Sequence, residues 1–139
     1  MDNNVFLTPV IALIIWSLVV WIILYARRIP AMTALKIKPD TAKSPGGDWK
    51  QKLPLKVQAP AHNYNHLMEQ PTIFYAFMFW AVLTGSATQL ILYLAWAYVA
   101  LRVVHSFIQI STGPVMVRFS VFAISTLCLF GMIGLSFLN

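Results

Sequence analysis

Four long apolar stretches constrain the fold of this chain more than any other feature of its sequence. They run from about Val5 to Tyr25, Leu67 to Leu83, Leu90 to Ile110 and Val117 to Leu138. Each is close to the ~20 residues that a helix needs to cross the hydrocarbon core of a bilayer. Because the chain has only 139 residues, we expect one all-α membrane domain over residues 1–139, built as a bundle of four transmembrane helices.

The composition supports a membrane protein and excludes several other classes. Hydrophobic residues make up 59% of the chain and charged residues 10%, whereas soluble domains carry about 25% charged residues. A soluble globular enzyme, a disordered tail and a nucleic-acid-binding module are therefore all excluded. With so little polar surface, the helices must pack against lipid and, we expect, against neighbouring subunits.

The net charge of +6 is concentrated in one segment, which predicts the orientation in the membrane. Eight basic residues and several prolines and glycines fall between residues 27 and 56, so we expect an irregular basic loop over residues 26–60. Basic loops beside membrane spans stay in the cytoplasm, where they face anionic headgroups. Both termini should then lie outside. The loop has a single aromatic residue, Trp49, and no basic helix face, which argues against nucleic-acid binding.

Polar residues at the start of the second span form the first candidate site. His62, Asn65, His66 and Glu69 follow one another at spacings of three and four, so they share one face of a helix. Pro71 should kink that helix just inside the membrane. Two histidines and a carboxylate at this spacing also resemble metal ligands, but the spacing alone is weak evidence, and we predict no metal site.

A second polar stripe runs along the third span and consists of Tyr98, Arg102, His105 and Gln109. A buried arginine requires a carboxylate partner, and Glu69 is the only acidic residue within the spans. We therefore expect Glu69 and Arg102 to pair, within one chain or across subunits. Two interpretations stay open: an ion pair that only fixes helix register, and one that also orients a ligand pocket.

Arg118, at the start of the fourth span, has two possible roles. It could anchor the helix end at the membrane surface, with its charge reaching into water. Alternatively, its charge could add to the partial positive charge of the helix N-terminus and favour a bound anion or thiolate.

Two sequence blocks resemble a known family. They are the segment NYNHLMEQPTIFY from Asn63 to Tyr75 and the segment AYVALRVVHS from Ala97 to Ser106, with Arg118 sixteen residues after Arg102. Together they are similar to the MAPEG family, the membrane-associated proteins in eicosanoid and glutathione metabolism, and to its poorly characterised bacterial branch. The resemblance implies a homotrimer of four-helix subunits in the bacterial inner membrane, with glutathione bound between subunits near the cytoplasmic face.

The resemblance also implies roles for individual residues. Arg118 would be catalytic and would hold the glutathione thiolate, and the substrate-binding residues would be His62, Asn65, Glu69, Arg102, His105 and Gln109. The chain departs from catalytic relatives where His66 replaces an asparagine, Gln109 replaces a tyrosine, and His62 and Asn65 stand in place of arginines.

These features leave two functional hypotheses. One is a glutathione-dependent transferase or peroxidase that acts on lipophilic electrophiles entering from the membrane. The other is a non-catalytic accessory or structural subunit of a membrane complex. A proton or ion path along the polar stripes is disfavoured because four short spans provide few polar steps.

Overall fold

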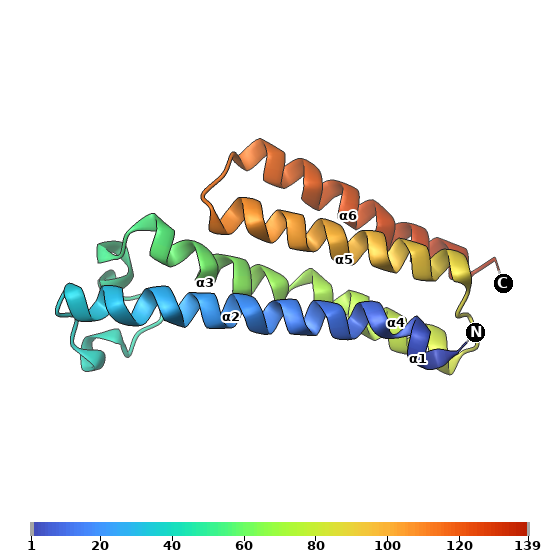
Figure 1. Cartoon of the computed structure of the whole chain (residues 1–139), viewed down its shortest axis with the longest axis horizontal. Coiled ribbons are helices and arrows are strands. Elements are labelled where there is room, and N and C mark those ends of the chain that lie inside the picture. The colour runs from blue at the N-terminus through green and yellow to red at the C-terminus, as the bar shows by residue number, and fades with distance from the viewer. Residues whose placement is uncertain (1, 139) are drawn as a thin grey trace.

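The structure is a computed structural model that describes residues 2–138, and all regular elements within that range are helical. In chain order they are α1 (Asn3–Phe6), α2 (Thr8–Ala34), the 3-10 turns η1 (Pro39–Ala42) and η2 (Asp48–Lys52), α3 (Leu55–Leu67), α4 (Gln70–Leu83), α5 (Gln89–Ile110) and α6 (Val115–Ser136). Figure 1 shows α2 running beside α3 and α4, with the α5–α6 hairpin alongside them. Both termini lie at one end of the molecule, and the segment between α2 and α3 lies at the other.

Three helical segments are long and apolar enough to cross a membrane: Asn3–Ala34, Gln89–Ile110 and Val115–Ser136. The expected second span is different. Its apolar part, α4, has 14 residues, or ~21 Å at 1.5 Å per residue. It follows the more polar α3 after a break at Met68 and Glu69. Residues 55–83 are therefore two consecutive helices rather than one.

The break between α3 and α4 confirms the effect expected of Pro71. The backbone of Glu69 has φ −89° and ψ −98°, which is outside the helical region. Pro71 has no N–H to donate to the carbonyl of Leu67, so the helical ladder is interrupted there. Thr72 then donates both its backbone N–H (3.2 Å) and its hydroxyl (2.6 Å) to the carbonyl of Glu69, which starts α4.

The first helix is longer, and the basic loop shorter, than the sequence suggested. Helix α2 continues past Arg27 and Arg28 and through Pro30 to Ala34, and α3 begins at Leu55, so the loop spans residues 35–54. The two arginines mark where the apolar stretch ends, but arginine is itself a good helix former. The two charged residues therefore mark the end of the apolar span but not the end of the helix.

The core lies where the α5–α6 hairpin meets α2, α3 and α4. Phe74 and Tyr98 stack there with ring centroids 4.7 Å apart, and both side chains are fully buried. The outer faces of the helices expose many large apolar side chains, such as Ile22 at 60% and Leu127 at 67%. An apolar surface of this kind suits contact with lipid.

Arg27 and Trp49 hold the loop end of the bundle together. Arg27 donates from Nη1 to the carbonyls of Lys56 (3.0 Å) and Ile110 (3.2 Å) and so joins α2 to α3 and α5. Trp49 is 9% exposed and donates from Nε1 to the carbonyl of Ser44 at 3.0 Å. The guanidinium of Arg28 lies 5.8 Å from the Trp49 ring centroid. The loop therefore packs around a tryptophan instead of extending irregularly.

Candidate functional site

Most of the predicted site residues meet in one cavity near the loop end of the bundle, which we call the site groove. It has a volume of about 200 Å³ and is lined by His62, His66, Glu69, His105, Gln109 and Arg118. These side chains come from α3, the helix break, α5 and α6. The two polar stripes read from the sequence thus face each other, and Arg118 joins them from the third side.

The side of the groove formed by α3 carries an exposed carboxylate next to a histidine. Glu69 Oε2 lies 3.5 Å from Nδ1 of His66, and the Glu69 side chain is 70% exposed. The ring of His66 packs against His105, with centroids 4.7 Å apart, and against Phe122 at 5.2 Å. The groove therefore offers an accessible hydrogen-bond acceptor above a layer of packed rings.

The expected ion pair between Glu69 and Arg102 is absent among residues 2–138. Arg102 is fully buried, and its only hydrogen bond there runs from Nη2 to the carbonyl of His66 at 3.4 Å. Its guanidinium lies 5.3 Å from the ring centroid of Phe122 and 6.0 Å from that of Tyr98. Glu69, the only acidic residue within the predicted spans, leaves the helical conformation at the break, and its side chain is 70% exposed. Pairing within one chain was therefore a wrong prediction, whereas pairing across subunits stays untested.

Asn63 is a site residue that sequence reasoning missed. It is fully buried and donates from Nδ2 to Oε1 of Gln109 at 2.9 Å, which couples α3 to α5. Within the described residues, its own Oδ1 has no hydrogen-bond partner. A signal was present in the sequence: Asn63 follows Ala59 and precedes Leu67 at spacings of four, so a polar residue interrupts the apolar face of α3.

A second cavity of about 340 Å³ adjoins the site groove and shares His62, Gln109 and Arg118 with it. The remaining lining residues are mostly small or apolar: Leu55, Ala59, Thr112, Gly113 and Val115. Arg118 therefore stands between a polar compartment and a more apolar one. This arrangement can hold a polar ligand beside an apolar one.

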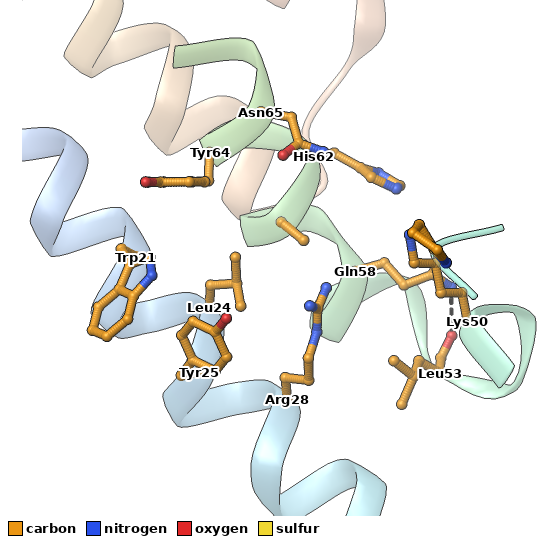
Figure 2. Close-up of a pocket in the computed structure, with 12 residues that line it drawn as sticks. Trp21, Leu24, Tyr25, Arg28, Lys50, Leu53, Gln58, His62, Tyr64 and Asn65 are labelled. Atoms are coloured by element: carbon orange, nitrogen blue, oxygen red, sulfur yellow. Dashed lines mark hydrogen bonds between the residues drawn. The ribbon is translucent and has the colours of Figure 1, made fainter. Parts of the chain in front are cut away.

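Two predicted site residues, Arg102 and Asn65, line neither compartment. Asn65 lines a third pocket of about 370 Å³ between α2 and α3, together with Trp21, Arg28, His62 and Tyr64. Figure 2 shows the guanidinium of Arg28 pointing into this space. The Nε atom of Arg28 is buried and has no hydrogen-bond partner within residues 2–138. His62 lines this pocket as well as the site groove and the second cavity, so it connects Asn65 to both.

Below the groove, a short chain of hydrogen bonds connects three helices. Tyr98 donates its hydroxyl to Oε1 of Gln70 at 3.2 Å, and Gln70 donates from Nε2 to Oγ1 of Thr126 at 3.0 Å. These bonds tie α5 to α4 and α4 to α6. They hold α4, α5 and α6 together near Arg102. They also explain the presence of Tyr98 in the second polar stripe, because its hydroxyl has a hydrogen-bond partner on α4.

The possible metal ligands do not converge. Across residues 2–138, no three His, Cys, Asp or Glu side chains form a group that could hold a metal ion. His62, His66 and Glu69 share a cavity but lack that geometry.

Of the comparisons with known proteins, one finds a match, and it covers nearly the whole chain. The family model described as "MAPEG family" matches residues 6–138. No curated protein sequence and no solved structure matches the chain.

Proposed function

Because this chain belongs to the MAPEG family and is an integral membrane protein, we propose that it is a glutathione-dependent transferase or peroxidase acting on lipophilic electrophiles. The observation that supports this most is the position of Arg118, which lines both the polar site groove and the adjoining apolar cavity. Glutathione is polar and the electrophile is not. A thiolate beside Arg118 would lie where the two compartments meet.

The chemistry requires glutathione to bind as a thiolate. A free thiol has a pKa of about 8.5, and lowering it to about 6.5 requires ~2.7 kcal/mol of preferential thiolate stabilisation. Arg118 lies in the first turn of α6 (Val115–Ser136), where free backbone N–H groups carry partial positive charge. The thiolate sulfur would attack the electrophile and form the new bond to sulfur, and the leaving group would depart with its electron pair.

The other lining residues provide groups that suit the rest of glutathione. The exposed carboxylate of Glu69 can accept hydrogen bonds from an ammonium group. Gln109 uses its Oε1 to bind Asn63, so its Nε2 is left to donate to a carboxylate or carbonyl. Arg28 lies in the same pocket as Asn65, and it offers a cation near the position where α3 has lost an arginine. We retain His62, Asn65, Glu69, Arg102, His105 and Gln109 as proposed binding residues, and Arg118 as the proposed catalytic residue.

We also propose the assembly and orientation of the family. The four spans would be α2, the α3–α4 pair crossing as one broken helix, α5 and α6, all within one domain. Three copies would form a homotrimer in which neighbouring subunits cover the open side of the groove. The loop over residues 35–54 would face the cytoplasm of a bacterial cell, with both termini on the opposite side of the inner membrane.

A second candidate function, the non-catalytic accessory subunit, rests on the hydrogen bond between Asn63 and Gln109. In catalytic relatives a tyrosine hydroxyl would stand at position 109, whereas here the amide oxygen already has a partner. His66 also stands in place of an asparagine, and its ring packs against His105. A chain that had lost the chemistry but kept the fold would show such internal contacts.

Thermal unfolding of the detergent-purified protein with and without glutathione separates the two functions. A ligand present at 100 times its Kd stabilises the folded state by about 2.7 kcal/mol, which raises the melting temperature by several degrees. The same peptide with a methyl group in place of the thiol is the matched control. Stabilisation by glutathione that exceeds that of the control supports a thiolate site. No stabilisation of an intact oligomer at millimolar glutathione would favour the accessory subunit.

A further inference from the structure

Helix α2 is longer than a membrane span, and its last turns lie beyond the hydrocarbon core. It has 27 residues, or ~40 Å at 1.5 Å per residue, against a core of ~30 Å. Counted from Thr8, the core ends near Arg27 and Arg28. The following turns enter the headgroup region, yet Ile29 there is 60% exposed. An apolar side chain exposed in the headgroup region is unfavourable unless another apolar group covers it.

Two adjoining cavities lie around this end of α2. One, of about 520 Å³, is lined largely by apolar side chains, including Ile29, Met32, Ile37 and Pro39, and we call it the overhang groove. The other, of about 440 Å³, is lined by Lys36, Lys38, Lys52, Thr41 and Asp48 beside Trp49, and we call it the lysine pocket. Lys36, Ile37 and Lys38 line both. An apolar and a cationic cavity are thus in direct continuity.

The backbone at Lys36 is held in a conformation that lysine rarely adopts. Helix α2 ends in a Schellman motif: Lys36 donates its N–H to the carbonyl of Thr33 at 3.1 Å, and Ile37 donates to that of Met32 at 3.0 Å. This motif requires a left-handed residue, usually glycine, and Lys36 has φ +53°. A residue with a Cβ is strained in that region. Such strain is characteristic of functional positions, and here it places an ammonium group where the two cavities meet.

We propose that the lysine pocket and the overhang groove together bind one anionic phospholipid. The phosphodiester is held by Lys36, Lys38 and Lys52, and the glycerol end and upper acyl chain lie along Ile29, Met32 and Ile37. Three ammonium groups against the single carboxylate of Asp48 leave the pocket positive, which complements an anionic headgroup and repels the cationic end of a zwitterionic one. Asp48 and Thr41 can bond to headgroup hydroxyls. This site is independent of the glutathione chemistry.

The close packing of the loop around Trp49 favours a defined lipid-binding site over a diffuse attraction between the basic loop and anionic lipids. Trp49 is nearly buried, and Lys50 and Arg28 both lie within 6 Å of its ring centroid, at 5.7 and 5.8 Å. Gly47 packs so closely that a Cβ there would lie 2.9 Å from Cδ1 of Trp49. One wall of the lysine pocket is therefore fixed before a lipid binds.

The test is native mass spectrometry of the purified full chain titrated with phosphatidylglycerol or phosphatidylcholine of matched acyl chains. The parent should retain phosphatidylglycerol at least tenfold more tightly. The double variant Lys36→Gly/Lys38→Gln keeps the left-handed turn and removes two charges, so phosphatidylglycerol affinity should fall about thirty-fold. Lys52→Gln tests the pocket without touching the turn and should lower affinity about fivefold. Ile29→Ser/Ile37→Ser should weaken binding of the lipid more than that of soluble glycerol phosphate.

The matched control is Lys43→Gln/Lys56→Gln, which removes two charges from the basic region between residues 27 and 56 but outside both cavities. Its phosphatidylglycerol affinity should stay within threefold of the parent. An equal loss in the control and site variants would show diffuse attraction to the loop and overturn the site. Equal binding of the two lipids, or binding of glycerol phosphate as tight as that of the intact lipid, would overturn it as well.

Discussion

The side chain of Asn63 donates to Oε1 of Gln109 at 2.9 Å and connects α3 to α5 beside the site groove. Because Asn63 is fully buried, this bond is sheltered from competing water. It fixes which end of the Gln109 amide faces a ligand: the oxygen is engaged, and the nitrogen is left to donate.

We expect Asn63→Leu, a substitution of similar volume, to destabilise the protein by about 1 kcal/mol, the net contribution of a typical hydrogen bond. In a double-mutant cycle with Gln109→Leu, the coupling energy should be of similar size. Thermal melts in detergent give both values. Additive effects would mean that the two side chains do not interact, and Asn65→Leu on the other side of α3 serves as the uncoupled control.

Periodicity predicted part of this site, and the structure shows why it could not predict all of it. Spacings of three and four placed His62 with His66, and His105 with Gln109, and these four side chains do line the site groove. Glu69 was expected beside Arg102 because it is the only acidic residue within the spans, but it lies in the break after Leu67 and its side chain is 70% exposed. Asn63 interrupts the apolar face of α3, which marks it as unusual, but its partner Gln109 lies 46 residues away and no local pattern identifies that partner.

The fold was predictable to a similar degree. Apolar stretches located α2, α5 and α6, since membrane helices are specified by hydrophobicity over some 20 residues. They did not show that α2 continues past Arg27 to Ala34, because charge ends a membrane span but not a helix. The packing of the loop around Trp49 depends on Arg28 and Ser44 together, and these contacts follow no repeating pattern.

The absence of an ion pair between Glu69 and Arg102 within the chain leads to a second prediction. Breaking a buried ion pair costs ~3–5 kcal/mol, but Glu69 is 70% exposed and lies next to His66. We therefore expect Glu69→Gln to change stability by less than 1 kcal/mol, as for exposed pairs. The coupling of Glu69→Gln to Arg102→Met should also stay below about 1 kcal/mol. A coupling of several kcal/mol in the assembled protein would instead place the two residues in contact across subunits.

The break at Pro71 can be tested by restoring the missing N–H. In Pro71→Ala the amide can donate to the carbonyl of Leu67, so residues 55–83 should form a straighter helix. Spin labels at the exposed positions Lys56 and Leu83 should move further apart, toward the ~41 Å of a continuous helix. Thr72→Val, which removes the hydroxyl bond to Glu69 but keeps the proline, should leave the distance unchanged. An unchanged distance in Pro71→Ala would mean that tertiary packing, and not proline, imposes the break.

Cysteine labelling tests whether α3 and α4 cross the membrane together. Cys128 is the sole cysteine, so Cys128→Ser provides a clean background. If the pair crosses, a cysteine at Lys43 should react only after permeabilisation, and one at Ser86 should react with an impermeant maleimide in intact cells. If only α2, α5 and α6 span, the two positions lie on the same side and should react alike, which would contradict the four-span topology.

The central claim is that Arg118 stabilises the glutathione thiolate, and the ultraviolet absorbance of the bound thiolate tests it most directly. The parent protein with glutathione at neutral pH should show a thiolate band. Arg118→Ala should lose the band and the turnover of a generic electrophile, with a smaller loss of glutathione affinity, because the contact strengthens as the thiolate forms. Arg118→Lys should retain part of both, since a point charge replaces the guanidinium fork. A thiolate band of undiminished size in a folded Arg118→Ala protein would contradict the account.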